Sequence, residues 1–407
     1  MNIWMLNHYA ITPDMPGGTR HYCLGRELVM RGYDVTIFAA SFNYSTRREE
    51  KLKKGERFRE EDVQGVRFIW IKSFPYLRNN WRRVVNWVTY AVRVIHIGSK
   101  MKERPDVIIG SSVHLFTPLS GYILARLKKS RFFFEVRDLW PQTLIDIGSI
   151  NRNHPFIILL RLLERFLYKK AERIITLLPK AGDYIKKCGI PEGKIAYLPN
   201  GVDIEAFPEQ KWPKTNGLAI TYLGTHGSAN ALDAIIEAAG ILESEGLNDI
   251  QFQFIGDGPL KQYLIDKIKT QGLRNIRFYN PLPKKDLYTV ARDTHAFIVN
   301  MKDIPLYRYG ISFNKIYDYM AMARPVIIGC SAGNNPIKEA SAGISVDADS
   351  PLQMAEAVRS LRGYSKERLL SMGNNGRAFV KRNNKYSVLS NNLEKWLKES
   401  LPYLGKE

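Results

Sequence analysis

Short apolar runs alternate with segments of helical periodicity through most of this chain, and the alternation restarts near residue 200. The predicted strands are residues 2–6, 34–40, 65–71, 106–110 and 132–136, then 218–223, 250–255, 276–279, 296–299 and 326–329. The predicted helices between them include residues 19–31, 117–128, 232–243, 260–271 and 284–291. Such alternation is typical of parallel strands covered by helices. It predicts an α/β fold with two doubly wound domains in series.

The length supports two domains, because 407 residues exceed what one ordinary core holds. We expect one domain over residues 1–199 and a second domain over residues 200–385. The amphipathic run 386–407 is expected to form a helix that rejoins the first domain. The charge-dense residues 47–62 are expected to form a solvated loop.

Cysteine usage and hydropathy indicate a cytoplasmic protein. The three cysteines lie far apart and have no metal-ligand spacing, which favours a reducing compartment. No apolar run reaches 18 residues, so no membrane-spanning helix is expected. The N-terminal residues lack the basic start and the continuous apolar region of a signal peptide.

Positive charge is concentrated in the first half of the chain. The formal net charge is +20, and residues 1–200 carry 34 Lys and Arg against 18 Asp and Glu. Such a surface could meet nucleic acid, an anionic membrane or a phosphorylated acceptor. Residues 81–98 form a predicted basic helix, typical of a membrane interface and also of a helix that covers a sheet. An exposed Trp87 would favour the membrane, whereas complete burial of both apolar sides would exclude it.

In the first half, two segments follow predicted strands, where open α/β sheets bind ligands. Gly17 and Gly18 come between the first strand and a helix, so a ligand could approach the backbone there, although a structural turn has the same composition. Glu135, Arg137 and Asp138 surround the end of another strand. Charged side chains near a core are costly unless they pair with one another or face a cleft.

Two loops of the second half also follow predicted strands. They contain Gly224, Thr225 and His226 after one strand, and Gly256, Asp257 and Gly258 after the next. The first loop suits phosphate oxygens, and His226 could either donate to a phosphate or be an exposed loop histidine. The second loop could read a base edge, or Asp257 could simply cap the following helix.

Residues 309–326 lead from a turn into a predicted helix that ends before a buried strand. The candidate contacts in this segment are Ser312, Phe313, Asn314, Lys315 and Asp318. A helix N-terminus offers free N–H groups and the positive end of the dipole. Lys315 could add charge, and Asp318 could accept hydrogen bonds from hydroxyl groups. The combination suits a nucleotide sugar. No Cys/His constellation or Walker A loop occurs, so no metal and no cofactor are expected.

Taken in this order, the segments resemble the retaining glycosyltransferases of family 4, which have the GT-B fold of two Rossmann-like domains facing across a cleft. The resemblance covers nearly the whole chain. It rests on Gly17-Gly18, Arg137-Asp138-Leu139-Trp140-Pro141, Asn200-Gly201-Val202-Asp203, Gly256-Asp257-Gly258-Pro259 and residues 313–326. The DLWP and NKxxDYMA forms are similar to the subgroup that builds O-antigen and capsule, often with acetamido sugars such as N-acetylfucosamine.

The resemblance implies a UDP-sugar site on the second domain and an acceptor site mainly on the first. Asp318 matches the second acid of the E-x7-E motif, which holds the ribose, whereas Gly310 stands in place of the first acid. Lys315 is the candidate replacement for an incomplete diphosphate clamp. Asp138 could orient the acceptor hydroxyl, beside Arg137 where many members carry histidine. We expect metal-independent transfer with retention, in which N–H groups, helix dipoles and Lys315 stabilise the leaving diphosphate.

The implied partners are a nucleotide sugar, a lipid-diphosphate-linked or polysaccharide acceptor and the inner face of the cell membrane, and not nucleic acid. Two alternatives remain open. A non-hydrolysing UDP-sugar epimerase of the same fold would need acids and histidines around the sugar. A non-catalytic homologue would use its basic half to bind a membrane or nucleic acid.

Overall fold

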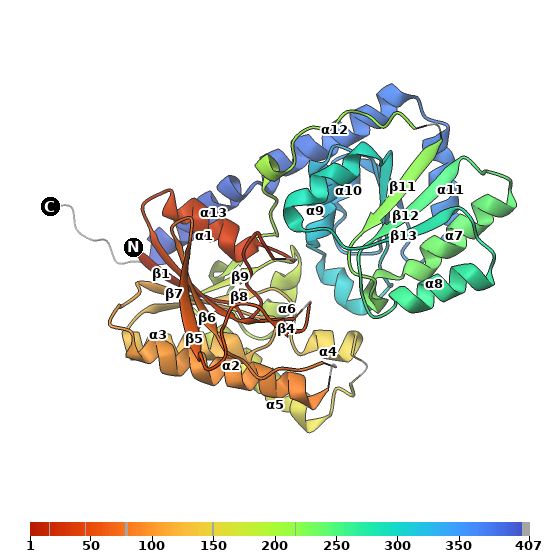
Figure 1. Cartoon of the computed structure of the whole chain (residues 1–407). Coiled ribbons are helices and arrows are strands. Elements are labelled where there is room, and N and C mark those ends of the chain that lie inside the picture. The colour runs from red at the N-terminus through yellow and green to blue at the C-terminus, as the bar shows by residue number, and fades with distance from the viewer. Residues whose placement is uncertain (16, 45, 78–79, 149, 216, 401–407) are drawn as a thin grey trace. The chain divides into compact units, whose positions relative to one another are not determined.

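The computed structural model describes residues 1–400 except 16, 45, 78–79, 149 and 216, and its elements form two compact units (Figure 1). The first unit comprises Met1–Pro199 and the segment from Tyr386 onward, and the second comprises Asn200–Lys385. No helix within the described ranges is long and apolar enough to cross a bilayer.

An eight-stranded sheet in the order β10-β9-β8-β7-β1-β2-β6-β5 lies at the centre of the first unit. Its strands are β1 (Asn2–Leu6), β2 (Asp34–Ala40), β5 (Phe58–Val63), β6 (Val66–Ile71), β7 (Val107–Ser111), β8 (Arg131–Val136), β9 (Arg173–Thr176) and β10 (Ile195–Tyr197). All neighbours are parallel except β5, which is antiparallel to β6. A small ladder pairs β3 (Phe42–Asn43) with β4 (Arg48–Glu49).

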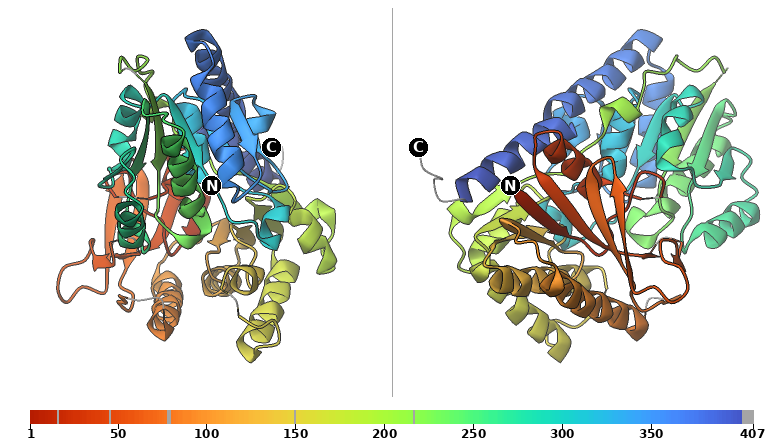
Figure 2. Two further views of the ribbon diagram at one scale, coloured as in Figure 1. Left: turned by 90° about the vertical axis from the view of Figure 1, so that its right-hand side faces the viewer. Right: turned by 60° about the vertical axis from the view of Figure 1, so that its left-hand side comes forward.

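Helices cover both faces of this sheet (Figure 1). On one face, α1 (Arg20–Val29) packs beside the C-terminal helix α13 (Tyr386–Ser400), as Figure 2 also shows. On the other face, α3 (Phe116–Lys128) packs between α2 (Trp81–Lys100) and α5 (Pro155–Lys170). The shorter helices of this unit are α4 (Gln142–Asp146), α6 (Ala181–Lys187) and η1 (Glu192–Lys194).

The second unit contains a fully parallel six-stranded sheet in the order β13-β12-β11-β14-β15-β16. Its strands are β11 (Leu218–Leu223), β12 (Ile250–Ile255), β13 (Ile276–Tyr279), β14 (Ala296–Val299), β15 (Val326–Gly329) and β16 (Gly343–Val346). The α-helices are α7 (Leu232–Ser244), α8 (Lys261–Thr270), α9 (Asn314–Ala321), α10 (Pro336–Glu339), α11 (Pro351–Arg362) and α12 (Lys366–Asn383). The 3-10 helices are η2 (Ile204–Ala206), η3 (Ser228–Asn230), η4 (Lys284–Arg292) and η5 (Pro305–Tyr309).

The structure confirms every strand predicted from the apolar runs, because these runs are long enough to fill a buried parallel strand. One local expectation was wrong. Residues 47–62 contain β4 and β5, and β5 alternates between exposed and half-buried residues because it is an edge strand. The segment 284–291 is helical, as predicted, in the form of a 3-10 helix.

The expectation for the basic helix 81–98 has a mixed outcome. Trp87 is 5% exposed, so the side chain that would have favoured a membrane contact is buried in the first unit. The helix is nevertheless not buried on both sides, because Trp81, Val88 and Val92 of α2 are exposed. The helix therefore covers the sheet and keeps an outer apolar strip.

Candidate functional site

In the second unit, Lys315 connects two of the predicted site segments at the carboxyl ends of the strands. Its Nζ donates a hydrogen bond to the Tyr222 hydroxyl at 3.1 Å and another to Oδ1 of Asn230. Its Cδ lies 3.6 Å from the point where a Cβ on Gly224 would stand. The start of α9 and the loop after β11 therefore meet at the lysine, and anion binding there stays a prediction.

The N-terminus of α9 carries no side-chain cap. Phe313 is the N-cap residue, and it has no side chain that can accept a hydrogen bond from the first turn. The side chain of Asn314 has no hydrogen-bond partner within the described ranges. The first N–H groups of the helix are therefore free to bind an anion.

Lys315 is half-buried, and its surroundings favour the neutral form of the ammonium group. Desolvation lowers the pKa of its ammonium group to about 7, because no carboxylate of the described chain forms an ion pair with it. The side chain is therefore partly neutral near neutral pH. A diphosphate beside it would favour the charged form and raise the pKa again.

The loops after β11 and β12 are held together by their backbones. Gly256 has φ +147°, and a Cβ there would lie 2.0 Å from the carbonyl oxygen of Gly224. His226 donates its N–H to the Asp257 carbonyl at 2.8 Å, and the Asp257 carboxylate accepts from the N–H of Gly258 at 2.8 Å. Glycine is needed here for the contact between the loops, and Asp257 stabilises its own turn.

His226 is not on the loop surface. Its side chain is fully buried, and its ring lies 5.6 Å from the ring of Phe278. Neither ring nitrogen has a partner in the described part of the chain, and desolvation lowers the pKa of the imidazole to about 4. The ring is therefore neutral, and the expectation of an exposed loop histidine is wrong, whereas the phosphate contact stays a prediction.

Asp318, the predicted ribose contact, is buried and already has a charged partner. Its Oδ2 accepts a hydrogen bond from Nζ of Lys284 at 2.5 Å. Desolvation raises the pKa of the Asp318 carboxyl, and the lysine opposes this shift. One carboxylate oxygen is thus occupied, and a ribose would have to use the other oxygen or displace Lys284.

Two features of residues 309–313 modify the predicted sugar contacts. Gly310 has φ +104°, a conformation that residues with a side chain rarely adopt. The hydroxyl of Ser312 accepts a hydrogen bond from the N–H of Asn200 at 2.8 Å, and the Ser312 carbonyl accepts another from the Asn200 side chain. Ser312 therefore anchors residue 200 within the second unit and has its hydroxyl engaged. Phe313 packs edge-on against Tyr307.

In the first unit, Arg137 and Asp138 follow β8 and make no ion pair with each other or with any other described residue. The N–H of Arg137 donates to the Ser112 hydroxyl at 3.1 Å. The Asp138 side chain is exposed to solvent. Both side chains are free to meet a ligand. Gly17 has φ +136°, and a Cβ there would lie 2.8 Å from Ile11.

A buried network that the sequence analysis did not identify lies beside these residues. Glu135 accepts hydrogen bonds from Nε of Arg20 at 2.9 Å and from the His21 ring at 2.8 Å. Burial alone would raise the pKa of Glu135, but Arg20 and His21 outweigh it and hold the pKa well below its ordinary value. Glu135 is therefore a paired structural carboxylate. No sequence signal links it to α1, which lies more than 100 residues away.

A second unpredicted cluster contains two buried histidines after β1 and β7. The rings of His8 and His114 meet at 3.1 Å, and Trp87 stacks on His114 with ring centroids 5.0 Å apart. Burial lowers the pKa of His8 to about 3 and that of His114 well below its ordinary value, so both rings are neutral. Among the described residues, no group of three or more His, Cys, Asp or Glu is arranged to hold a metal ion.

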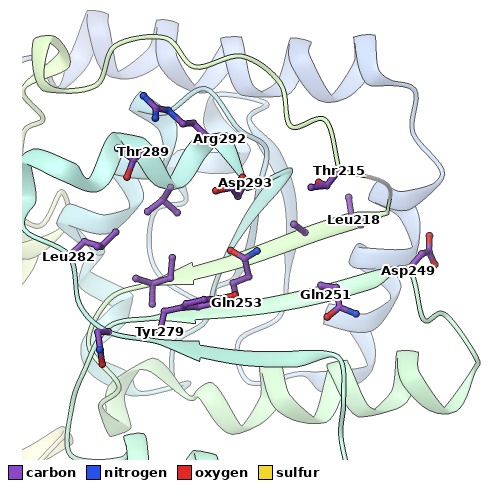
Figure 3. A pocket seen from close by; sticks show the side chains of 14 residues that line it. Thr215, Leu218, Asp249, Gln251, Gln253, Tyr279, Leu282, Thr289, Arg292 and Asp293 are labelled. Atoms are coloured by element: carbon purple, nitrogen blue, oxygen red, sulfur yellow. The ribbon is translucent and has the colours of Figure 1, made fainter.

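A groove of about 650 Å³ runs along the second sheet between β11, β12 and η4 (Figure 3). Gln251, Gln253 and Tyr279 contribute to its wall, and Thr289 and Arg292 lie on the side of η4. None of the predicted donor contacts lines it. The groove is therefore separate from the candidate anion site at the start of α9.

Comparisons with known proteins agree with this architecture. Residues 17–201 match the family described as "Glycosyl transferase 4-like domain", and residues 217–363 match "Glycosyl transferases group 1". The chain is 22% identical over 275 residues to the glycosyl transferase WcaI of Escherichia coli (strain K12), which is named for colanic acid biosynthesis. That alignment covers 64% of this chain and 66% of the relative, just under two thirds of its length.

Solved structures show the same fold over the whole chain. Sucrose-phosphate synthase from Thermosynechococcus elongatus has a TM-score of 0.77 at 13% identity, with 98% of each chain covered. Anabaena Alr3699/HepE, solved in complex with UDP-glucose, has a TM-score of 0.68 at 11% identity, with 98% of this chain and 100% of that chain covered. The predicted GT-B fold is thereby confirmed.

Proposed function

Since this chain belongs to the family 4 glycosyltransferases with the GT-B fold, we propose that it transfers a sugar from a UDP-sugar to a lipid-linked or polysaccharide acceptor in surface glycan biosynthesis. The observation that carries the proposal is Lys315 beside Gly224 at an uncapped helix N-terminus. A relative named for colanic acid biosynthesis and a neighbour solved with UDP-glucose support the acceptor class and the donor class.

In this proposal the diphosphate of the donor binds at the start of α9. The free N–H groups and the positive end of the helix dipole attract the phosphate oxygens, and Lys315 adds a full charge once the anion has raised its pKa. These groups also stabilise the charge that develops on the leaving diphosphate. They would replace a divalent cation, so we expect the activity to survive a chelator.

The sugar and the acceptor are bound by other groups. Gly310 offers no carboxylate to the sugar, and the Ser312 hydroxyl is engaged, so backbone N–H groups around Asn314 take over recognition of the sugar. The resemblance of the 313–326 segment to the O-antigen and capsule subgroup supports an N-acetylated amino sugar as the transferred group. On the first unit, Asp138 orients the acceptor hydroxyl for a front-face displacement with retention, and Arg137 attracts an acceptor diphosphate.

Titration calorimetry with UDP and a panel of UDP-sugars tests the proposal. We expect binding of UDP by the wild-type protein, and a loss of about tenfold or more in Lys315→Met, because a charge-assisted hydrogen bond disappears. Lys338→Met, at an exposed lysine on α10, is the matched control and should bind like the wild type. The proposal fails if no UDP-sugar binds, or if both variants bind as the wild type does.

A further inference from the structure

The helix α5 exposes a continuous apolar stripe. Ile158, Leu162 and Phe166 follow one another at intervals of four residues, and Leu159 lies beside them. Leu159 and Leu162 are each 60% exposed. Other apolar residues of α5 already fill the side that faces the sheet. Single exposed leucines are ordinary, but a contiguous stripe on a helix marks an interaction surface.

The stripe belongs to a larger surface, which we call the outer layer of α2, α3 and α5. The three helices lie side by side on one face of the first sheet (Figure 1). The neighbouring helices add exposed apolar side chains, namely Trp81, Val88 and Val92 on α2 and Leu127 on α3. Tyr122 of α3 meets Phe166 of α5 edge-to-face at 5.1 Å, so the apolar surface is continuous between these two helices.

The outer layer carries charge of one sign. Four Lys and Arg residues lie on α2, two on α3 and four on α5, and the sole acid of these three helices is Glu164. Glu164 is buried and accepts hydrogen bonds from Tyr168 at 3.0 Å and from Tyr184 at 3.1 Å. The helices therefore present no acidic side chain to the outside.

We propose that the outer layer of α2, α3 and α5 docks on an anionic lipid surface. The stripe of α5 enters the headgroup region, and the surrounding Lys and Arg side chains reach the lipid phosphates. A second copy of the chain fits this surface poorly, because a two-fold contact would bring two sets of like charges together, including the exposed Arg165, Lys169 and Lys170 of α5. A nucleic acid also fits poorly, because its phosphates and base edges are polar and would not contact the exposed leucines favourably.

This inference deepens the proposed function by naming the surface through which the enzyme meets a membrane, and it rests on that function only for its biological setting.

Sedimentation with phosphatidylcholine vesicles, with and without phosphatidylglycerol, tests the inference directly. We expect binding only to the anionic vesicles. The double substitution Leu159→Asp and Leu162→Asp should weaken binding at least about tenfold. Lys169→Ala and Lys170→Ala should each cost about fivefold.

Two controls match these variants in the second unit. Leu352, which is 71% exposed on α11, takes the substitution Leu352→Asp, and Lys269 in the last turn of α8 takes Lys269→Ala. Both should sediment like the wild type. Calorimetry with UDP on every variant reports separately on the fold and on the donor site. Vesicle binding without UDP binding would support the inference while the proposed function fails.

Three outcomes would overturn the inference. The first is that the wild type fails to sediment with anionic vesicles. The second is that the α5 variants and their controls bind vesicles equally well. The third is that light scattering shows a wild-type dimer that the α5 leucine variants dissociate while vesicle binding stays unchanged, which would assign the stripe to a contact between copies.

Discussion

At the scale of single residues, Lys315 shows how burial prepares a group for an anion. Its ammonium group donates to two neutral oxygens, so desolvation is not offset by a carboxylate. Phosphate oxygens would supply the missing negative charge. Without an anion the site therefore favours the neutral form of Lys315, and with a bound anion it favours the charged form.

This argument predicts a pH dependence of donor binding. The free pKa of Lys315 is about 7 and a bound diphosphate raises it, so binding takes up a proton above neutral pH and the affinity falls as pH rises. UDP-glucose is the suitable ligand for this measurement, because its diphosphate does not change its protonation state near neutral pH. Calorimetry in buffers of different ionisation enthalpy measures the uptake. A pH-independent affinity in the wild type, or the same slope in Lys315→Met, would contradict the prediction.

The backbone conformation at Gly310 disfavours any side chain there. At φ +104°, any side chain is strained, so Gly310→Glu should destabilise the protein by about 1–3 kcal/mol and should not improve donor binding. Gly310→Ala separates the two effects, because it has the same backbone strain without a carboxylate. Thermal unfolding of both variants checks this. A stable Gly310→Glu variant with tighter UDP-sugar binding would show that the segment can accommodate the family acid.

At the scale of elements, the Glu135 network joins α1 to the central strands. Arg20 of α1 reaches Glu135 at the end of β8 and also donates to the carbonyl groups of Leu198 and Pro199, which follow β10. These contacts position the helix that follows the Gly17 loop. The network thus holds the edge of the sheet where Asp138 lies.

Removing the carboxylate from this network should be costly. Glu135→Gln leaves the Arg20 charge buried without its partner, so we expect a loss of about 3–5 kcal/mol in the free energy of unfolding measured in urea. Glu172→Gln, which breaks the exposed ion pair with Arg131, should cost less than about 1 kcal/mol. Equal losses in the two variants would show that the network carries no special stability.

The same network predicts an acid-sensitive stability. The folded pKa of Glu135 lies below its unfolded value, so its contribution is present above the unfolded pKa and is lost as pH falls through the folded pKa. Stability curves of the wild type and Glu135→Gln should therefore converge in acid. Curves that stay parallel from neutral to acid pH would rule this out.

The sequence predicted elements with strong local signals and missed contacts between distant segments. The strands and the start of α9 follow from apolar runs and from the turn before Asn314, both of which are local. The position of His226 did not follow, because its burial depends on Phe254 and Phe278 of other strands. The ion pair between Lys284 and Asp318 could likewise not be predicted from the sequence, because the two residues are 34 positions apart.

At the scale of the whole molecule, the predicted donor contacts other than Gly17 and Gly18 lie in the second of two units with separate hydrophobic cores. Hydrogen exchange with UDP-glucose should therefore show added protection in the loops after β11 and β12 and at the start of α9. At a ligand concentration 100 times the dissociation constant, the added stability is about 2.7 kcal/mol. Protection centred on residues 17–18 or 137–138 would contradict this prediction and would indicate that the donor binds mainly to the first unit.

Because α13 is the last helix to be synthesised, the second unit is complete before the first unit is. Leu389, Leu393 and Leu397 share a hydrophobic cluster with Leu24 and Leu28 of α1, so the first unit needs residues from the opposite end of the chain. A ribosome has made the whole contiguous second unit before it makes α13. Until α13 has been synthesised, the apolar face of α1 that it covers stays exposed. Chaperones that act during translation could bind this face.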